Sequence, residues 1–185
     1  MAVVGLHYSL NYRYFNMVDV TKSIKAVLIL DIDGQRCLGR VFDEETCTRA
    51  FEKKLYMSTK MQKIKDEIMI IDETLVVHKF VTDLHFYVVG RKNENPLILD
   101  YLLRCLVESA TELCSPKLLE KQILLDHLSK MVLVMDEIYD NGIILETDSN
   151  LVIQRICLKS NMAELTVAQK LQSASETFKF PWIRS

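Results

Sequence analysis

Two aspartates and a glycine stand where an apolar segment ends, in VLILDIDGQ at residues 27–35. In this order Asp31 is placed to attack a phosphorus atom and Asp33 to act as a general acid, while a Mg²⁺ ion held by the carboxylates offsets the developing charge. This is the segment of the chain that most strongly suggests catalysis, and it predicts a phosphatase loop if the surrounding elements fit.

The same residues resemble the nucleophile loop of haloacid-dehalogenase-type phosphatases, but two features depart from that family. The family continues with a hydroxyl residue and an apolar residue after the glycine, where this chain has Gln35 and Arg36. The family's fold also alternates parallel strands with helices, whereas a second strand pattern follows here at once. Because Asp and Gly favour hairpin turns, we favour a turn and keep a Mg²⁺-dependent phosphatase that uses Asp31 as a minor alternative.

Other residue types that carry chemistry do not converge in the sequence. The four histidines, His7, His78, His85 and His127, lack the spacing of a zinc site. His78 and His85 can meet on adjacent strands, but two histidines without a third ligand are more typical of a sheet surface. The chain has no nucleophile elbow, P-loop or glycine-rich dinucleotide motif. We therefore predict no catalytic residue, cofactor or metal site, and no enzyme.

The elements around Asp31 follow a strand-rich pattern. Residues 24–30 and 37–42 predict two strands joined by the acidic turn, which together form a β-hairpin. A surface helix is expected over residues 45–60, and further strands over 67–90 with bends at Asp72-Glu73 and Thr82-Asp83. The last of these strands carries apolar residues on both sides, so we expect helices on both faces of the sheet.

The second half of the chain is helical. Asn95 and Pro96 provide an N-cap and a first-turn proline for a helix with an apolar stripe up to Leu113. Residues 115–148 then predict one long helix of about 36 Å, with Ser115 as its N-cap and Asn141-Gly142 as its C-terminal cap. Its apolar stripe is wide, so we expect part of it to meet the sheet and part to meet another protein. Two shorter helices are expected near residues 150–158 and 166–178.

Length and composition are those of one globular domain. With 185 residues, 49% hydrophobic and 26% charged, we predict an N-terminal extension at 1–22, a domain at 23–158, and a C-terminal helix and tail at 159–185. The extension shows no clear period and is expected to be mobile or loosely docked. Hairpin, helix, strands and then helices only indicate an α+β fold with an antiparallel sheet.

Charge and cysteine content limit the function classes. A formal net charge of −2 without long runs of one sign argues against nucleic acid and against a polybasic membrane surface. Five widely spaced cysteines without a C-x-x-C pair are typical of reduced cytosolic thiols. No apolar run approaches the length of about twenty residues that spans a bilayer. We therefore expect a cytoplasmic protein.

Several longer strings resemble the small-chain family of vesicle coats, which comprises the zeta chains of coatomer, the COPI coat, and more distantly the sigma chains of clathrin adaptors. The matching strings, distributed in order from about Ser23 to Leu158, are IKAVLILDIDGQR, AFEKKLY, LVVHKF, DLHFYVVG and MDEIYDNGIILETDSNLVIQR. None of these strings is specific alone, but their combination is.

The resemblance implies a longin-like fold, a five-stranded antiparallel sheet flanked by helices on both faces, and a structural role. It implies that the chain packs on the gamma-coatomer subunit, alongside other coatomer subunits, in a complex that an Arf-type GTPase recruits to Golgi membranes. The implied function is Golgi-to-ER and intra-Golgi vesicle transport. A longin module of a tethering or SNARE-regulating complex is the alternative within the same fold.

The candidate partner surface combines apolar residues of a strand and two helices with an acidic helix end. Aromatic residues and methionine are favoured anchors at interfaces, although core packing is at least as good an interpretation of each apolar residue. The candidates are Leu84, Phe86, Tyr87, Leu102, Leu106, Met131, Met135, Asp136 and Glu137.

Overall fold

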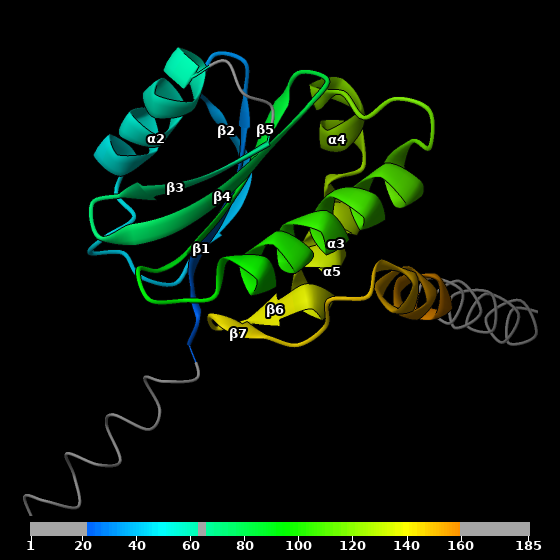
Figure 1. Ribbon diagram of the computed structural model, residues 1–185. Helices are drawn as coiled ribbons and strands as arrows, with labels where there is room; N and C mark the ends of the chain where they lie inside the picture. The colour runs from blue at the N-terminus through cyan, green and yellow to red at the C-terminus, as the bar shows by residue number, and fades with distance from the viewer. Residues whose placement is uncertain (1–21, 63–65, 160–185) are drawn as a thin grey trace, which may run out of the picture.

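The computed structural model describes residues 22–62 and 66–159, and its centre is one antiparallel sheet in the order β2-β1-β5-β4-β3 (Figure 1). The strands are β1 (Ile24–Asp31), β2 (Arg36–Val41), β3 (Asp66–Ile71), β4 (Thr74–Val81) and β5 (Leu84–Arg91). The predicted five-stranded antiparallel sheet is confirmed. The expected N-terminal extension and C-terminal segment lie, apart from one residue each, outside the described residues.

Tight turns join the strands where the sequence predicts them. The β3–β4 turn places Asp72 and Glu73 at φ 45° and 62°, the left-handed pair that matches the twist of a hairpin. In the β4–β5 turn, Thr82 has φ 56°. These turns pair β3 with β4 and β4 with β5, and β5 also pairs with β1, so β5 is the central strand.

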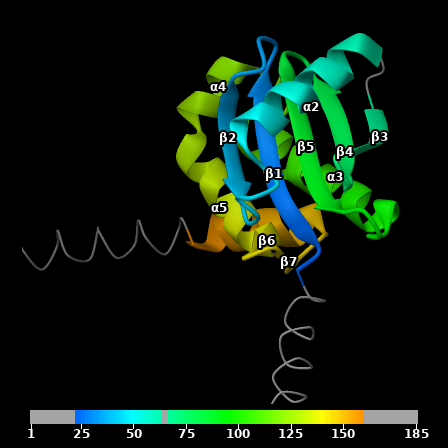
Figure 2. The ribbon, with the colours of Figure 1, turned by 90° about the vertical axis from the view of Figure 1, so that its left-hand side faces the viewer.

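Helix α2 (Arg49–Gln62) covers one face of the sheet (Figure 2). Its buried residues Phe51 and Leu55 pack against side chains of the sheet that include Leu28 and Val89. The helix begins four residues later than predicted because the hydroxyl of Thr48 accepts the backbone N–H of Phe51 at 3.3 Å and so acts as the N-cap.

Helices α3 (Pro96–Cys114) and α5 (Leu128–Ile138) cover the opposite face of the sheet (Figure 2). The predicted cap of α3 is confirmed, because the Asn95 side chain accepts the N–H of Leu97 at 3.0 Å and Pro96 is the first helical residue. The two covered faces give two apolar clusters, one under α2 and a larger one under α3 and α5.

The predicted single helix over residues 115–148 is wrong. Ser115 caps the C-terminus of α3, donating its N–H to the Thr111 carbonyl at 3.0 Å, and α4 (Lys121–Asp126) is separated from α5 by His127. The N-cap function passes to a residue far away in the sequence, because the Asp83 side chain accepts the N–H of Lys121 at 2.9 Å. Because Asp83 belongs to another loop, the residues just before α4 contain no N-cap motif from which the start of this helix could be predicted.

The Asn141-Gly142 pair makes a hairpin turn instead of a helix cap. It joins the two-residue strands β6 (Tyr139–Asp140) and β7 (Ile143–Ile144), with φ of 46° and 81° at the two turn residues. The Gly142 carbonyl accepts the N–H of Ile24 at 3.1 Å, which ties this hairpin to the start of β1. The chain is helical again from residue 149 to 159, after a cap in which Asp148 accepts the N–H of Asn150, and the helix expected near 150–158 is confirmed. The helix expected at 166–178 lies outside the described residues.

Candidate protein-binding surface

Both oxygens of the Asp31 carboxylate have partners inside the protein. Asp31 is 2% exposed, and its Oδ1 accepts the backbone N–H groups of Asp33 at 2.9 Å and Gln35 at 2.8 Å. Its Oδ2 receives the Lys121 ammonium at 2.7 Å. Burial raises the pKa of Asp31, but the hydrogen bonds from Lys121, Gln35 and Asp33 outweigh it and hold the pKa below its ordinary value. The carboxylate therefore closes the β1–β2 turn and joins that turn to α4.

This geometry gives Asp31 a structural role. The side chain of Asp33 is exposed. Across residues 22–62 and 66–159, no group of three or more His, Cys, Asp or Glu side chains is arranged to hold a metal ion. A nucleophilic carboxylate also needs a free oxygen facing substrate, whereas both oxygens of Asp31 have partners in the protein.

The two histidines that were expected to meet do so, beneath α2. His78 Nε2 and His85 Nδ1 lie 3.0 Å apart, the rings stack at 5.2 Å, and His78 also stacks on Tyr87 at 4.7 Å. Burial, and secondarily the neighbouring His85, lowers the pKa of His78 to about 4. The Tyr87 hydroxyl lies 2.8 Å from the hydroxyl of Thr59 on α2. Burial also lowers the pKa of His85, so both rings are neutral near pH 7 and pack α2 on the sheet.

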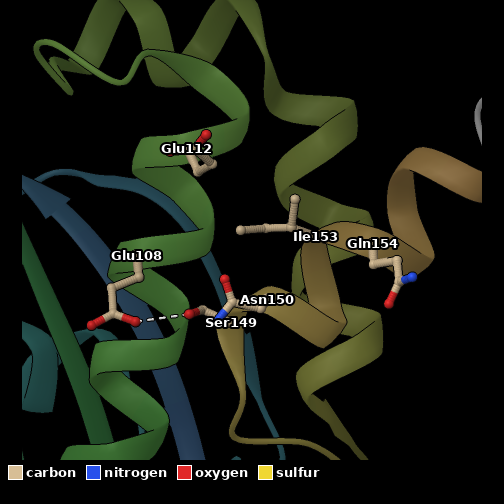
Figure 3. A pocket seen from close by; sticks show the side chains of 6 residues that line it. All are labelled: Glu108, Glu112, Ser149, Asn150, Ile153 and Gln154. Carbon is tan, nitrogen blue, oxygen red and sulfur yellow. Dashed lines mark hydrogen bonds between the residues drawn. The ribbon is translucent and has the colours of Figure 1, made fainter.

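A polar depression lies between α3 and the helix at residues 149–159 (Figure 3). It has a volume of about 400 Å³, and the Ser149 hydroxyl donates to the Glu108 carboxylate across it at 2.8 Å. Among the described residues that line it there is no histidine or cysteine, and the Glu108 carboxylate is held by the Ser149 hydroxyl. Its lining residues are Glu108, Glu112, Ser149, Asn150, Ile153 and Gln154.

The apolar residues predicted for the partner surface belong to the protein's own core. Each is 0% exposed, so none can contact a partner: Leu84, Phe86, Tyr87, Leu102, Leu106, Met131 and Met135. Apolar residues have the same spacing along the sequence whether they face the core or a partner. Only the packed tertiary structure shows which of the two they contact. The prediction for these seven residues is corrected to core packing.

The two acidic candidates lie at the surface and have partners in the same chain. Asp136 forms an ion pair with Arg40 of β2, and Glu137 forms ion pairs with Arg155 and Lys159 of the last described helix. The positive side chains of Arg40, Arg155 and Lys159 offset the negative charge at the C-terminal end of α5. A role of Asp136 and Glu137 toward a partner stays a prediction.

Another set of apolar residues is exposed on α4, α5 and the segment before α4, and we call it the α4–α5 face. Leu125, Leu128 and Val132 recur at three- and four-residue steps and are 39%, 37% and 36% exposed. Leu118 and Leu133 are 47% and 38% exposed. Leu118, Leu125, Leu128 and Val132 belong to the wide stripe predicted from the sequence, but periodicity alone does not indicate which of its two sides is buried. Leu128 and Val132 are four residues apart on α5 and therefore lie on the same side of that helix, and exposed apolar residues grouped in this way are typical of a protein-binding surface.

Over residues 23–163 the chain matches the family described as clathrin adaptor complex small chain. The chain belongs to this family, whose members are structural small chains of adaptor and coat complexes.

Individual relatives narrow the comparison. The chain is 37% identical to coatomer subunit zeta-1 of Homo sapiens over 169 residues, which covers 88% of this chain and 94% of the relative. It is 33% identical to coatomer subunit zeta-1 of Arabidopsis thaliana over 170 residues, which covers 86% and 96%. The resemblance drawn from the sequence is confirmed.

The solved structures agree on the fold. A chain in a homology model of the full-length AP-3 complex in a stretched open conformation superposes with a TM-score of 0.55 at 19% identity, covering 79% of this chain and 98% of that one. The predicted longin-like fold is confirmed. No helix within the described residues is long and apolar enough to cross a bilayer.

Proposed function

We propose that the chain is the small structural subunit of a COPI-type coat and packs on the gamma-coatomer subunit. One observation carries this proposal: the match to coatomer zeta-1 at 37% identity extends over 94% of that relative, so it includes the whole small-chain domain. Other coatomer subunits complete the complex, and an Arf-type GTPase acts on the complex to bring it to Golgi membranes, where it remains peripheral. The transport routes are Golgi-to-ER and intra-Golgi.

The α4–α5 face supports this proposal and is the surface that we assign to the large subunit. Complete burial of a leucine or valine is worth about 1.5–3 kcal/mol, so covering the exposed third or more of five such side chains contributes about 3–6 kcal/mol. This is a substantial part of the free energy of a stable interface, to which polar contacts at the rim add specificity.

Co-expression with the gamma large subunit tests the proposal. The wild-type chain and gamma are expected to elute together, and the double variant Leu128→Asp, Val132→Asp is expected to lose gamma, because it places two charges in an apolar interface. The matched control is Leu97→Asp, Tyr101→Asp, since these residues are also exposed, at 61% and 62%, but lie at the start of α3. The control is expected to keep gamma.

Two outcomes would count against the proposal. If the wild-type chain ignores gamma and instead co-purifies with tethering or SNARE-regulating proteins, the chain is a longin module of another complex. If both double variants retain gamma equally, the chain binds gamma through a different surface. Circular dichroism of each variant separates lost binding from lost folding.

A further inference from the structure

Strand β3 forms an open edge of the sheet, on the side farthest from β2 (Figure 2). It pairs with β4 alone, from Asp66 opposite Lys79 to Ile71 opposite Thr74, and no register shift interrupts this pairing. The outer side of its backbone has no neighbouring strand among the described residues. A regular edge of this kind is a template for a further strand, and proteins usually interrupt such edges with bulges, prolines or charges.

One face of this edge is covered and the other is open. Met69 and Ile71 pack with the apolar cluster under α2. Ile68 and Ile70 lie on the other face, because their partners on β4 belong to the cluster under α3 and α5. These two isoleucines are 51% and 62% exposed. Two large aliphatic side chains therefore stand next to each other beside an unpaired backbone.

Two copies of this edge are complementary to each other. A twofold axis at Met69, perpendicular to the sheet, pairs two β3 strands antiparallel and sets Ile68 of each copy opposite Ile70 of the other. Directly opposed side chains of an antiparallel pair lie on the same face, with Cβ atoms about 5 Å apart, so the four isoleucines form one apolar cluster. A twofold axis one residue away instead puts an isoleucine opposite an aspartate, Asp66 or Asp72.

We propose that two copies of the chain associate through this edge, with β3 paired to β3 about a twofold axis at Met69, so that their sheets join into one. The pairing provides partners for the outer backbone groups of both edges at once and sets Ile68 against Ile70 twice. It uses no residue of the α4–α5 face, so it is independent of the proposed coat function.

The contact is small, so the dimer is expected to be weak. It contains one six-residue strand from each copy, whereas a standard interface has about 20–30 residues a side. The register also sets Asp66 opposite Asp72 of the second copy, and Lys54, which pairs with Asp72, offsets part of this repulsion. We therefore expect dimers at high protein concentration and monomers after dilution.

Sedimentation velocity of the full-length chain, from about 1 to about 200 μM, tests the association. The wild type is expected to change from monomer to dimer over this range. The variant Ile68→Lys, Ile70→Lys is expected to stay monomeric, because each cross-strand pair then holds two like charges. The matched control Ile68→Lys, Ile70→Glu changes the same residues but joins opposite charges in each pair, so it is expected to dimerise. Circular dichroism checks that each variant is folded.

Amide hydrogen exchange of the wild type at both ends of this concentration range locates the contact. The β3 amides that point away from β4 are expected to exchange at least about fivefold more slowly at high concentration, because pairing with a second strand protects them. The amides of β2, at the other edge of the sheet, are expected to exchange equally at both concentrations.

Three results would overturn the proposal. A wild type that stays monomeric at every concentration would show that a second copy does not occupy the edge, and protected β3 amides in that monomer would assign the edge to another segment of the same chain. Dimerisation of the variant Ile68→Lys, Ile70→Lys would show that the copies meet at a different surface. A dimeric wild type with a monomeric Ile68→Lys, Ile70→Glu variant would show that Ile68 does not face Ile70, which rules out the axis at Met69.

Discussion

Replacement of Asp31 by alanine is expected to destabilise the protein strongly, because the buried carboxylate holds the β1–β2 turn together. The change removes the acceptor of two backbone N–H groups in the β1–β2 turn, and hydrogen bonds to a charged group are worth about 1.5–3 kcal/mol each. Asp33 and Gln35 are exposed, so water recovers part of this loss. We expect a net loss of about 2–4 kcal/mol, a large fraction of the 5–15 kcal/mol typical of a domain.

Urea unfolding at a series of pH values measures this effect and its electrostatic origin. The pKa of Asp31 lies below its ordinary value in the folded protein, so the stabilisation is fully present above the pKa of the unfolded chain, near 4. It is lost as the pH falls through the lower folded-state pKa. The gap in unfolding free energy between the wild type and Asp31→Asn is therefore expected to narrow in strong acid.

The neighbouring aspartate supplies the control for this experiment. Asp33 lies in the same turn with an exposed side chain, and Asp33→Ala is expected to change stability by less than about 0.5 kcal/mol. The reasoning is refuted if Asp31→Ala unfolds at the same urea concentration as the wild type. It is also refuted if Asp31→Asn leaves stability unchanged but abolishes hydrolysis of a phosphate ester, because Asp31 would then be a nucleophile.

Three further predictions concern the core and the turns. Since burial lowers the pKa of His78 to about 4 while the unfolded value is near 6.5, the unfolded chain binds more protons between these values. Stability should therefore fall as the pH drops from about 6.5 to 4, and thermal melts of His78→Phe should show a weaker pH dependence. Gly142→Ala should lower stability by about 2 kcal/mol in the same assay, because φ is +81° and the new Cβ would lie 2.7 Å from the Ile24 carbonyl oxygen. Leu102→Ala should cost about 2–5 kcal/mol in urea unfolding, whereas Leu97→Ala on the exposed side of α3 should cost less than about 0.5 kcal/mol. Equal effects of the two leucine changes would contradict the core assignment of Leu102.

Much of the secondary structure was predictable because its signals are local. The alternation of β1, the turn residues Asp72-Glu73 and the Asn95-Pro96 cap act through neighbouring backbone atoms, and all three appear where the sequence predicts them. The break between α4 and α5 was not predictable in this way. The N–H of Lys121 is capped by Asp83, a partner 38 residues away that becomes a neighbour only after the sheet has formed.

The candidate partner surface was likewise predictable only in part: local signals located the apolar stripe, but not the side of it that is exposed. The stripe over residues 118–138 correctly indicated more apolar residues than one neighbour covers, but the candidates chosen from it, Met131 and Met135, are buried. Leu128 and Val132, from the same stripe, are exposed. A helix with apolar residues around most of its circumference contains no local signal for which side meets the sheet, because both sides have the same spacing.

The sequence by itself determined the antiparallel sheet, the helices on both of its faces and the family, since alternation, turn chemistry and ordered strings of residues are properties of the chain. The tertiary structure decided the role of Asp31, the division of the long helix, the hairpin at Asn141-Gly142 and the identity of the exposed face. Each of these depends on a contact between distant segments, such as Asp31 with Lys121 or Gly142 with Ile24. Such contacts exist only once the strands have been brought into register, so their energies cannot be read from neighbouring residues.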